Sequence, residues 1–127
     1  MNRTKTILII EDNADSLYLY GEILRSENFT VIETGDGKEA LLQMEASEVL
    51  PHLIIMDLSF PFMTAEEFVQ ALKANPKWAK IPLLVVSGHL ETEKRSIGLR
   101  ANGYITKPFE IDDLLSKVSE FTSKSYG

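Results

Sequence analysis

The stretch Ile7-Leu8-Ile9-Ile10-Glu11-Asp12, close to the N-terminus, predicts the fold class of the whole chain. Its first four residues are all apolar, without the alternation that a strand with one solvated face shows. A strand with this pattern is buried on both faces, as the strands of a parallel sheet are. The run then stops at two acids, so we expect a buried strand whose carboxyl end carries charge.

Four further apolar runs follow along the chain. Two are continuous like the first, and two are shorter and more mixed, as the flanking strands of a sheet are. The continuous runs are Leu53-Ile54-Ile55-Met56 and Leu83-Leu84-Val85-Val86, and the mixed runs are Thr30-Val31-Ile32 and Tyr104-Ile105. We therefore expect five strands.

Segments with helical periodicity separate these runs. Apolar stripes at helical spacing lie within residues 17–24, 40–44, 65–72 and 111–121, and Thr64 before Glu67 predicts a capping box at the third helix. The segment Leu90–Ala101 has the weakest stripe, so we expect the fourth helix to be the least stable. The alternation predicts an α/β fold, a doubly wound (βα)5 five-stranded parallel sheet with right-handed crossovers and helices on both faces.

Length and composition narrow the class of protein. The 127 residues suit a single domain, from a first strand near residues 6–11 to a last helix near residues 110–122. A formal net charge of -6, without clustered Lys and Arg, argues against nucleic-acid binding. The chain has no Cys, and its N-terminal apolar run is too short for a signal peptide or a membrane span. We expect a cytoplasmic protein that binds neither nucleic acid nor membrane.

The carboxyl ends of the predicted strands carry the chemically capable groups. Glu11 and Asp12 follow the first strand, Asp57 the third, Ser87 the fourth and Lys107 the fifth. In an open α/β sheet the functional crevice lies outside these ends. If these strands are neighbours, the three acids crowd together, which raises the pKa of at least one of them or requires a cation. Oxygen ligands of this kind suit Mg²⁺. One carboxylate could then attack a phosphoryl donor, while an ammonium and a hydroxyl stabilise the transferred group.

Four motifs in this order resemble the receiver domain of two-component response regulators. They are Ile7–Asn13, Ile54–Asp57 with Pro61, Val85–Gly88 and Tyr104–Phe109, and their spacing matches the family along nearly all of the chain. The resemblance implies a flavodoxin-like strand order of 2-1-3-4-5. It also implies a switch that takes a phosphoryl group from a histidine kinase or a histidine phosphotransfer protein and then acts on an unknown downstream protein. Such a domain catalyses its own phosphotransfer and dephosphorylation and is not a conventional turnover enzyme.

The resemblance assigns the phosphoacceptor position to Asp57 and the direct Mg²⁺ ligand position to Asp12. Glu11 takes the position of the acid that reaches the ion through water, and Ser59 the position whose backbone carbonyl completes the protein ligands. Ser59 and His89 lie where family members vary, and we expect them to tune the lifetime of the phosphorylated state. Glu11 and Asp12 could instead cap the following helix, a role compatible with metal binding.

The remaining assignments concern the fourth and fifth strands. Lys107 matches the lysine that pairs with the phosphoryl group, and the Lys107–Pro108 bond is typically cis in the family. Ser87 matches the switch hydroxyl and Tyr104 the switch aromatic. Ser87 could also be a structural hydroxyl at a strand end, and Tyr104 could be part of the core.

Two stretches depart from the family pattern. Thr64-Ala65 stands where the family often has Gly, and Leu99-Arg100-Ala101 precedes the fifth strand where small residues are usual. Arg100 would be strained if its backbone needed a positive φ. The output face, formed by the fourth helix, fifth strand and fifth helix, could therefore be unusual. We expect a monomer, or a weak dimer that forms through this face. Two alternatives stay open: a degenerate receiver that binds without being phosphorylated, and the N-terminal fragment of a longer multidomain regulator.

Overall fold

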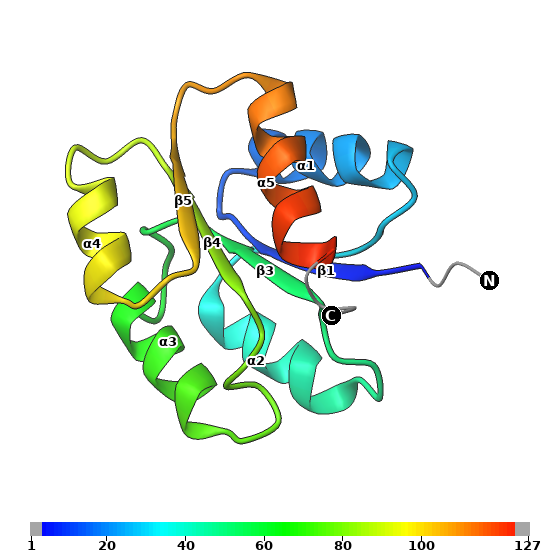
Figure 1. Ribbon diagram of the computed structural model, residues 1–127. Coiled ribbons are helices and arrows are strands. Elements are labelled where there is room, and N and C mark those ends of the chain that lie inside the picture. Colours follow the sequence, from blue (N-terminus) through cyan, green and yellow to red (C-terminus); the bar gives the residue numbers. More distant parts are fainter. Residues whose placement is uncertain (1–3, 124–127) are drawn as a thin grey trace.

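The computed structural model describes residues 4–123 as five strands that alternate with five helices. They are β1 (Thr6–Ile10), α1 (Ala14–Ser26), β2 (Thr30–Thr34), α2 (Gly37–Ala46), β3 (Leu53–Met56), α3 (Ala65–Ala74), β4 (Leu83–Ser87), α4 (Thr92–Gly98), β5 (Gly103–Thr106) and α5 (Ile111–Ser123). Neighbouring strands pair in parallel, in the order β2-β1-β3-β4-β5. The predicted doubly wound fold and its strand order are confirmed (Figure 1).

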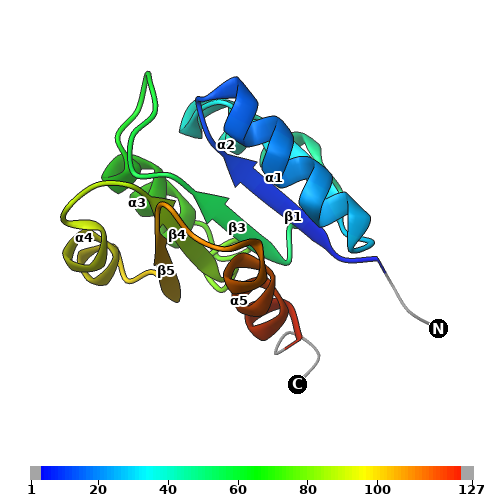
Figure 2. The ribbon, with the colours of Figure 1, turned by 90° about the horizontal axis from the view of Figure 1, so that it is seen from above.

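The sheet is covered on both faces, which explains the continuous apolar runs. Along β1, Leu8 and Ile10 pack with residues of α2 and α3, whereas Ile7 and Ile9 pack with residues of α1 and α5. Seen from above, α1 and α5 lie nearer the viewer than α2 and α3 (Figure 2). Successive side chains of a strand point to opposite faces. A strand covered twice must therefore be apolar at every position, and all four residues are fully buried.

Side-chain caps fix where the helices begin. The Asn13 side chain accepts a hydrogen bond from the backbone N–H of Ser16 and so caps α1. At α3, Thr64 accepts from the N–H of Glu67, and the Glu67 carboxylate accepts from the N–H of Thr64. The predicted capping box is confirmed, and it satisfies N–H groups that the first turn of a helix leaves unpaired.

The fourth helix differs from the prediction. It is shorter than Leu90–Ala101, and the apolar residues of its expected stripe face solvent, with Leu90 104% and Ile97 69% exposed. Thr92 and Ser96 are buried in their place, and their hydroxyls donate to the carbonyls of His89 and Thr92. The inner face of this helix is therefore polar, and its hydroxyls pair with nearby backbone carbonyls.

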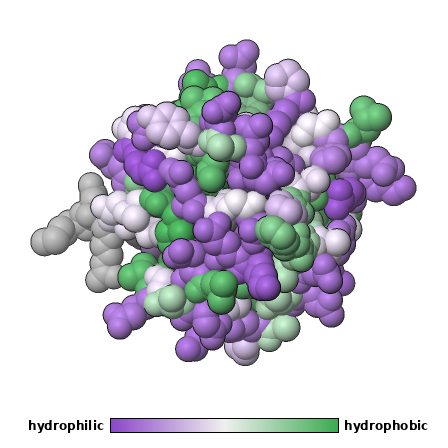
Figure 3. Space-filling view, turned by 180° about the vertical axis from the view of Figure 1, so that it is seen from behind, coloured by the Kyte–Doolittle hydropathy of each residue, from purple (hydrophilic) through white to green (hydrophobic). Residues whose placement is uncertain are grey.

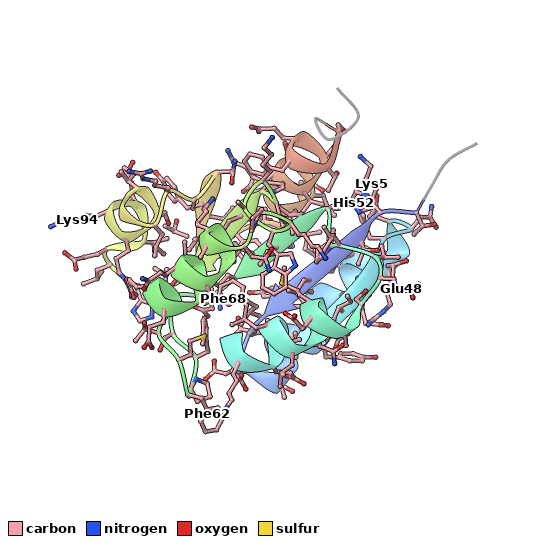
Figure 4. All side chains as sticks on the ribbon, turned by 90° about the horizontal axis from the view of Figure 1, so that it is seen from below. Lys5, Glu48, His52, Phe62, Phe68 and Lys94 are labelled. Atoms are coloured by element: carbon pink, nitrogen blue, oxygen red, sulfur yellow. The ribbon has the colours of Figure 1, made fainter. Side chains whose placement is uncertain are left out.

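Three residues other than glycine have a positive φ in the described part of the chain. They are Asn28 (70°), Phe62 (73°) and Arg100 (60°). Arg100 therefore adopts the conformation that the sequence flagged as costly at this position. Phe62 lies in the loop between β3 and α3 and points away from the body of the molecule (Figure 4).

The surface is mostly polar. On the face opposite the view of Figure 1, apolar side chains are scattered among hydrophilic ones (Figure 3). The helices between residues 4 and 123 are all too short or too polar to cross a bilayer.

Candidate functional site

The predicted functional residues lie at the carboxyl ends of neighbouring strands. The backbone N–H of Asp57 donates to the carbonyl of Ile10 at 3.0 Å, so the end of β3 is fastened to the end of β1. The N–H of Lys107 donates to the carbonyl of Ser87 at 2.9 Å, which fastens the end of β5 to β4. Groups that are far apart in the sequence thus share one edge of the sheet.

Lys107 joins the two acids of this edge. Its Nζ atom lies 3.0 Å from Oε1 of Glu11 and 3.2 Å from Oδ2 of Asp57, and it donates a hydrogen bond to each. The Glu11 side chain is 3% exposed, that of Asp57 12% and that of Lys107 28%. The ammonium is therefore the counter-ion of two poorly solvated carboxylates, and such partly buried pairs are screened much less by salt than surface pairs.

The backbone holds the other oxygen of each carboxylate. Oε2 of Glu11 accepts from the N–H of Asn13 at 3.2 Å, and Oδ1 of Asp57 accepts from the N–H of Leu58 at 2.6 Å. Each acid therefore contacts the start of its own loop with one oxygen and Lys107 with the other. This arrangement fixes the orientation of both carboxylates.

Burial and charge act in opposite directions on these groups. Burial raises the pKa of Glu11, and its hydrogen bonds to Lys107 and Asn13 oppose that shift only in part. Burial alone would lower the pKa of Lys107, but the hydrogen bond to Glu11 and the charge of Asp57 outweigh it, so its pKa lies above the ordinary value. Lys107 is thus a permanent cation at any physiological pH.

The structure does not gather all the predicted metal ligands. Asp12 and Ser59 are exposed, and Asp12 takes no part in the hydrogen bonds that centre on Lys107. Within residues 4–123, no set of three or more His, Asp or Glu side chains is arranged to hold a metal ion. The donor chemistry still suits Mg²⁺, because Glu11, Asp12 and Asp57 are acids at adjacent strand ends and Lys107 neutralises only one of them.

Ser87 lies beneath the loop that leads into α4. It is fully buried, and its Oγ accepts a hydrogen bond from the backbone N–H of His89 at 3.3 Å. The Thr92 hydroxyl donates to the carbonyls of Ser87 and His89 and closes the same turn. The His89 side chain is exposed. The Ser87 hydroxyl is thus tied to the β4–α4 loop, and its backbone carbonyl is tied to Lys107.

Tyr104 lies within β5, and Pro108 lies two residues after the strand ends. The Tyr104 ring packs against the core on the α2 and α3 face, and its hydroxyl donates to Oε2 of Glu93 on α4 at 2.8 Å. This hydrogen bond raises the pKa of the Tyr104 phenol. The Lys107–Pro108 bond is cis, as predicted.

One neighbour of this site, Tyr20, was not predicted as a site residue from the sequence. We expected it only as part of the apolar stripe of α1, yet the Lys107 Nζ atom lies over its ring at 5.9 Å from the ring centroid. Its ring also contacts that of Phe109, with 5.9 Å between centroids. The signal that could have revealed it is the polar tip of a tyrosine on a helix face that packs beside the acidic strand ends.

Sequence comparisons agree with the fold. The chain matches the response regulator receiver domain over residues 7–119. The cell cycle response regulator CtrA of Brucella ovis is 30% identical over 124 residues, which are 95% of this chain and 51% of CtrA. The chain therefore spans about half the length of the curated relatives it matches.

Solved structures show the same architecture. The chemotaxis response regulator CheY4 of Vibrio cholerae aligns with a TM-score of 0.84 and 25% identity, over 94% of this chain and 99% of that chain. The phosphorylated cyanobacterial phytochrome response regulator RcpA aligns with a TM-score of 0.80 and 27% identity, over 97% of this chain and 96% of that chain. Because the family match extends over most of the chain and the fold agrees, the protein belongs to the response regulator receiver domain family.

Proposed function

We propose that this receiver is switched by phosphorylation of Asp57 in a Mg²⁺-dependent reaction. The observation that supports this most directly is the position of the Lys107 ammonium, 3.0 Å from Glu11 and 3.2 Å from Asp57. An ammonium beside a carboxylate nucleophile can stabilise the oxygens of a transferred phosphoryl group. The likeness to RcpA, a structure of a phosphorylated response regulator, supports the same reaction.

The bonds that form and break in the transfer belong to the Asp57 carboxylate and the donor. An oxygen of Asp57 attacks the phosphorus of a phosphohistidine, the new O–P bond forms, and the P–N bond breaks with its electron pair left on the imidazole nitrogen. Hydrolysis of the aspartyl phosphate by water returns the carboxylate and releases inorganic phosphate. Lys107 contributes by holding positive charge where the phosphoryl oxygens arrive.

Mg²⁺ would be held by the carboxylates of Glu11, Asp12 and Asp57 and by the backbone carbonyl of Ser59. Three acids and one ammonium leave this edge with excess negative charge, which would repel an incoming phosphoryl group. A bound divalent ion supplies the neutralising charge. Because Asp12 lies outside the Lys107-centred hydrogen bonds, we expect ion binding to recruit its exposed side chain.

We propose a histidine kinase or a histidine phosphotransfer protein as donor, and an unidentified protein as target. The target surface is the face formed by α4, β5 and α5, where Ile97 is exposed and can contact a partner or a second copy in a weak dimer. The net charge of -6 makes nucleic acid an unsuitable direct partner. We place these events in the cytoplasm, where two-component donors act.

The proposal is tested with acetyl phosphate and Mg²⁺ on the whole chain, followed by intact-protein mass spectrometry. We expect the wild type to gain one phosphoryl group, while Asp57→Asn gains none. Asp12→Asn should slow the reaction strongly at a fixed Mg²⁺ concentration, and EDTA should stop it. Ser59 and His89 are the proposed lifetime residues, and the decay of the product in His89→Ala tests the second of them.

Each outcome has a defined meaning. If neither the wild type nor Asp57→Asn gains mass, the chain is a degenerate receiver that acts by binding alone. If Asp57→Asn gains the group as readily as the wild type, the modified residue is not Asp57. If His89→Ala loses phosphate at the wild-type rate, His89 does not tune the lifetime.

A further inference from the structure

Tyr20 touches both the ammonium of Lys107 and the chain segment that carries it. It projects from α1 into the core on the α1 and α5 face and is 6% exposed. The Lys107 Nζ atom lies over its ring, 5.9 Å from the centroid. The ring of Phe109, two residues beyond Lys107, lies 5.9 Å away with an interplanar angle of 36°. A single buried side chain thus contacts the β5–α5 segment at two places.

A lysine needs such support in order to work as a fixed charge. Its ammonium sits on a flexible four-carbon stem, so an unsupported head samples many positions. The face of an aromatic ring carries partial negative charge and attracts a cation placed over it within about 6 Å. Glu11 and Asp57 attract the ammonium with full negative charges, and the Tyr20 ring adds a weaker attraction.

The environment keeps the Tyr20 phenol neutral. Burial raises its pKa, and the charge of Lys107 opposes that shift only in part. A neutral phenol adds no third negative charge beside Glu11 and Asp57. The ring can therefore support the cation without competing for it as a full counter-ion.

We propose that Tyr20 is a positioning residue for phosphoryl transfer, holding the Lys107 ammonium in register with Glu11 and Asp57. This inference rests on the function proposed above. It predicts that loss of the ring slows phosphoryl transfer because the Lys107 ammonium is misplaced, and not because the protein unfolds. It also predicts that the ring matters more than the hydroxyl.

The first test compares Tyr20→Leu and Tyr20→Phe in the whole chain with acetyl phosphate and Mg²⁺. Donor concentration is varied, so that the maximal rate is separated from the half-saturating concentration. Tyr20→Leu should lower the maximal rate roughly three- to tenfold, the range that a cation–π contact supports, with the half-saturating concentration little changed. Tyr20→Phe keeps the ring and should lose less than about twofold. Should Tyr20→Leu fail to fold, Tyr20→Met replaces it, because methionine adapts to irregular core space.

A double-mutant cycle separates positioning from general damage. In a Lys107→Met background the Tyr20→Leu change should cause no further loss of rate. Leu24→Ala, one turn along α1 in the same part of the core, is the matched control, since it should lower stability without slowing transfer. A wild-type maximal rate in Tyr20→Leu overturns the proposal. If Tyr20→Leu reduces the maximal rate by the same factor with and without Lys107, the proposal is also overturned.

A signature that needs no phosphate distinguishes failure of this inference from failure of the proposed function. The methylene protons of the Lys107 side chain near the Tyr20 ring should resonate upfield in NMR spectra of the wild type. The shift should persist in Tyr20→Phe and vanish in Tyr20→Leu. A shift unchanged in Tyr20→Leu overturns the positioning role, whether or not Asp57 accepts phosphate. A wild type that takes no phosphate but shows the ring-dependent shift contradicts the proposed function alone.

Discussion

At the scale of single residues, Arg100 has a backbone conformation that its side chain makes costly. It follows the end of α4 with a φ of 60°, and its N–H donates to the carbonyl of Ile97, while that of Ala101 donates to the carbonyl of Ser96. This pair of bonds is the Schellman motif, in which glycine is favoured at the left-handed position. Asn28 fills the corresponding position after α1, and asparagine tolerates it better than arginine does.

We therefore expect Arg100→Gly to stabilise the protein. The left-handed conformation costs an ordinary residue about 1–2 kcal/mol, and the greater chain entropy of glycine returns part of that, which leaves a gain of roughly 0.5–1 kcal/mol. Urea unfolding at neutral pH measures it. Lys94→Gly, inside α4 and exposed, is the matched control and should destabilise by about 1 kcal/mol. An Arg100→Gly protein no more stable than the wild type contradicts the argument.

The positions of Asp57 and Lys107 were predictable because each directly follows a strand. Once the strands are aligned in parallel, the residues after them must share one edge. The contacts of Asp12 and Tyr20 were not predictable in this way. The first depends on which rotamer an exposed acid adopts, and the second depends on how α1 is rotated against the sheet, which the apolar stripe defines only to within a residue.

At the scale of secondary structure, α4 has the weakest support. It has seven residues, and its N-cap residue Glu91 makes no side-chain hydrogen bond to the first turn. Its links to the rest of the protein include a surface ion pair between Arg95 and Glu66, at 3.0 Å, and the bond from Tyr104 to Glu93. Exposed ion pairs contribute about 0–1 kcal/mol and weaken with salt.

We predict that the amides of α4 exchange with solvent faster than those of any other helix in residues 14–123. Short length, an absent cap and exposed apolar side chains all favour local opening. Hydrogen exchange followed by mass spectrometry measures this. Helix α3, with its capping box and buried stripe, is the internal reference. Equal protection in α3 and α4 would show that α4 opens only with the whole domain.

Helical periodicity predicted four helices well because their inner faces are apolar. It failed for the inner face of α4, where Thr92 and Ser96 are buried. A prediction from apolar periodicity assumes that residues with hydroxyls are exposed. The hydroxyls of Thr92 and Ser96 donate to nearby carbonyls, so their burial costs little free energy. The low stability expected for this helix stays a prediction.

At the scale of the whole molecule, the end of the sheet opposite the functional site depends on a neutral histidine. The backbone N–H of His52 donates to the carbonyl of Thr6, and the N–H of Thr6 donates to Nδ1 of His52. Figure 4 shows Lys5 beside His52 at this end. Burial, and then the charge of Lys5, lower the pKa of His52. Nδ1 can accept the hydrogen bond from Thr6 only when that nitrogen is unprotonated, so this contact requires the neutral ring.

Stability should therefore fall as the solution is acidified. The folded state binds the His52 proton less readily than the unfolded chain, whose pKa is about 6.5, so the stabilisation is complete above that value and is lost as pH falls through the folded pKa. His52→Asn places a non-titrating acceptor at Nδ1 and should flatten the dependence between about pH 7 and pH 5.5. The raised pKa of Glu11, which burial causes, changes stability with pH in the opposite direction, but it does so in both the wild type and His52→Asn.

Urea unfolding over this pH range provides the measurement. His89→Asn is the matched control, since the sequence contains two histidines and the His89 side chain is exposed. It should keep the wild-type pH dependence. A His52→Asn protein whose stability falls as steeply as that of the wild type would exclude His52 as the source.

The contact of Lys107 with Glu11 and Asp57 spans 96 and 50 residues of sequence. It can form only after β5 has docked, because Lys107 follows β5, which lies at the edge of the sheet beside β4. If Asp57 takes phosphate as proposed, a chain still emerging from the ribosome lacks the Lys107 ammonium beside Asp57 until residues 1–107 have been synthesised and β5 has docked against β4. The ability to receive the signal then depends on prior assembly of the sheet from β1 to β5.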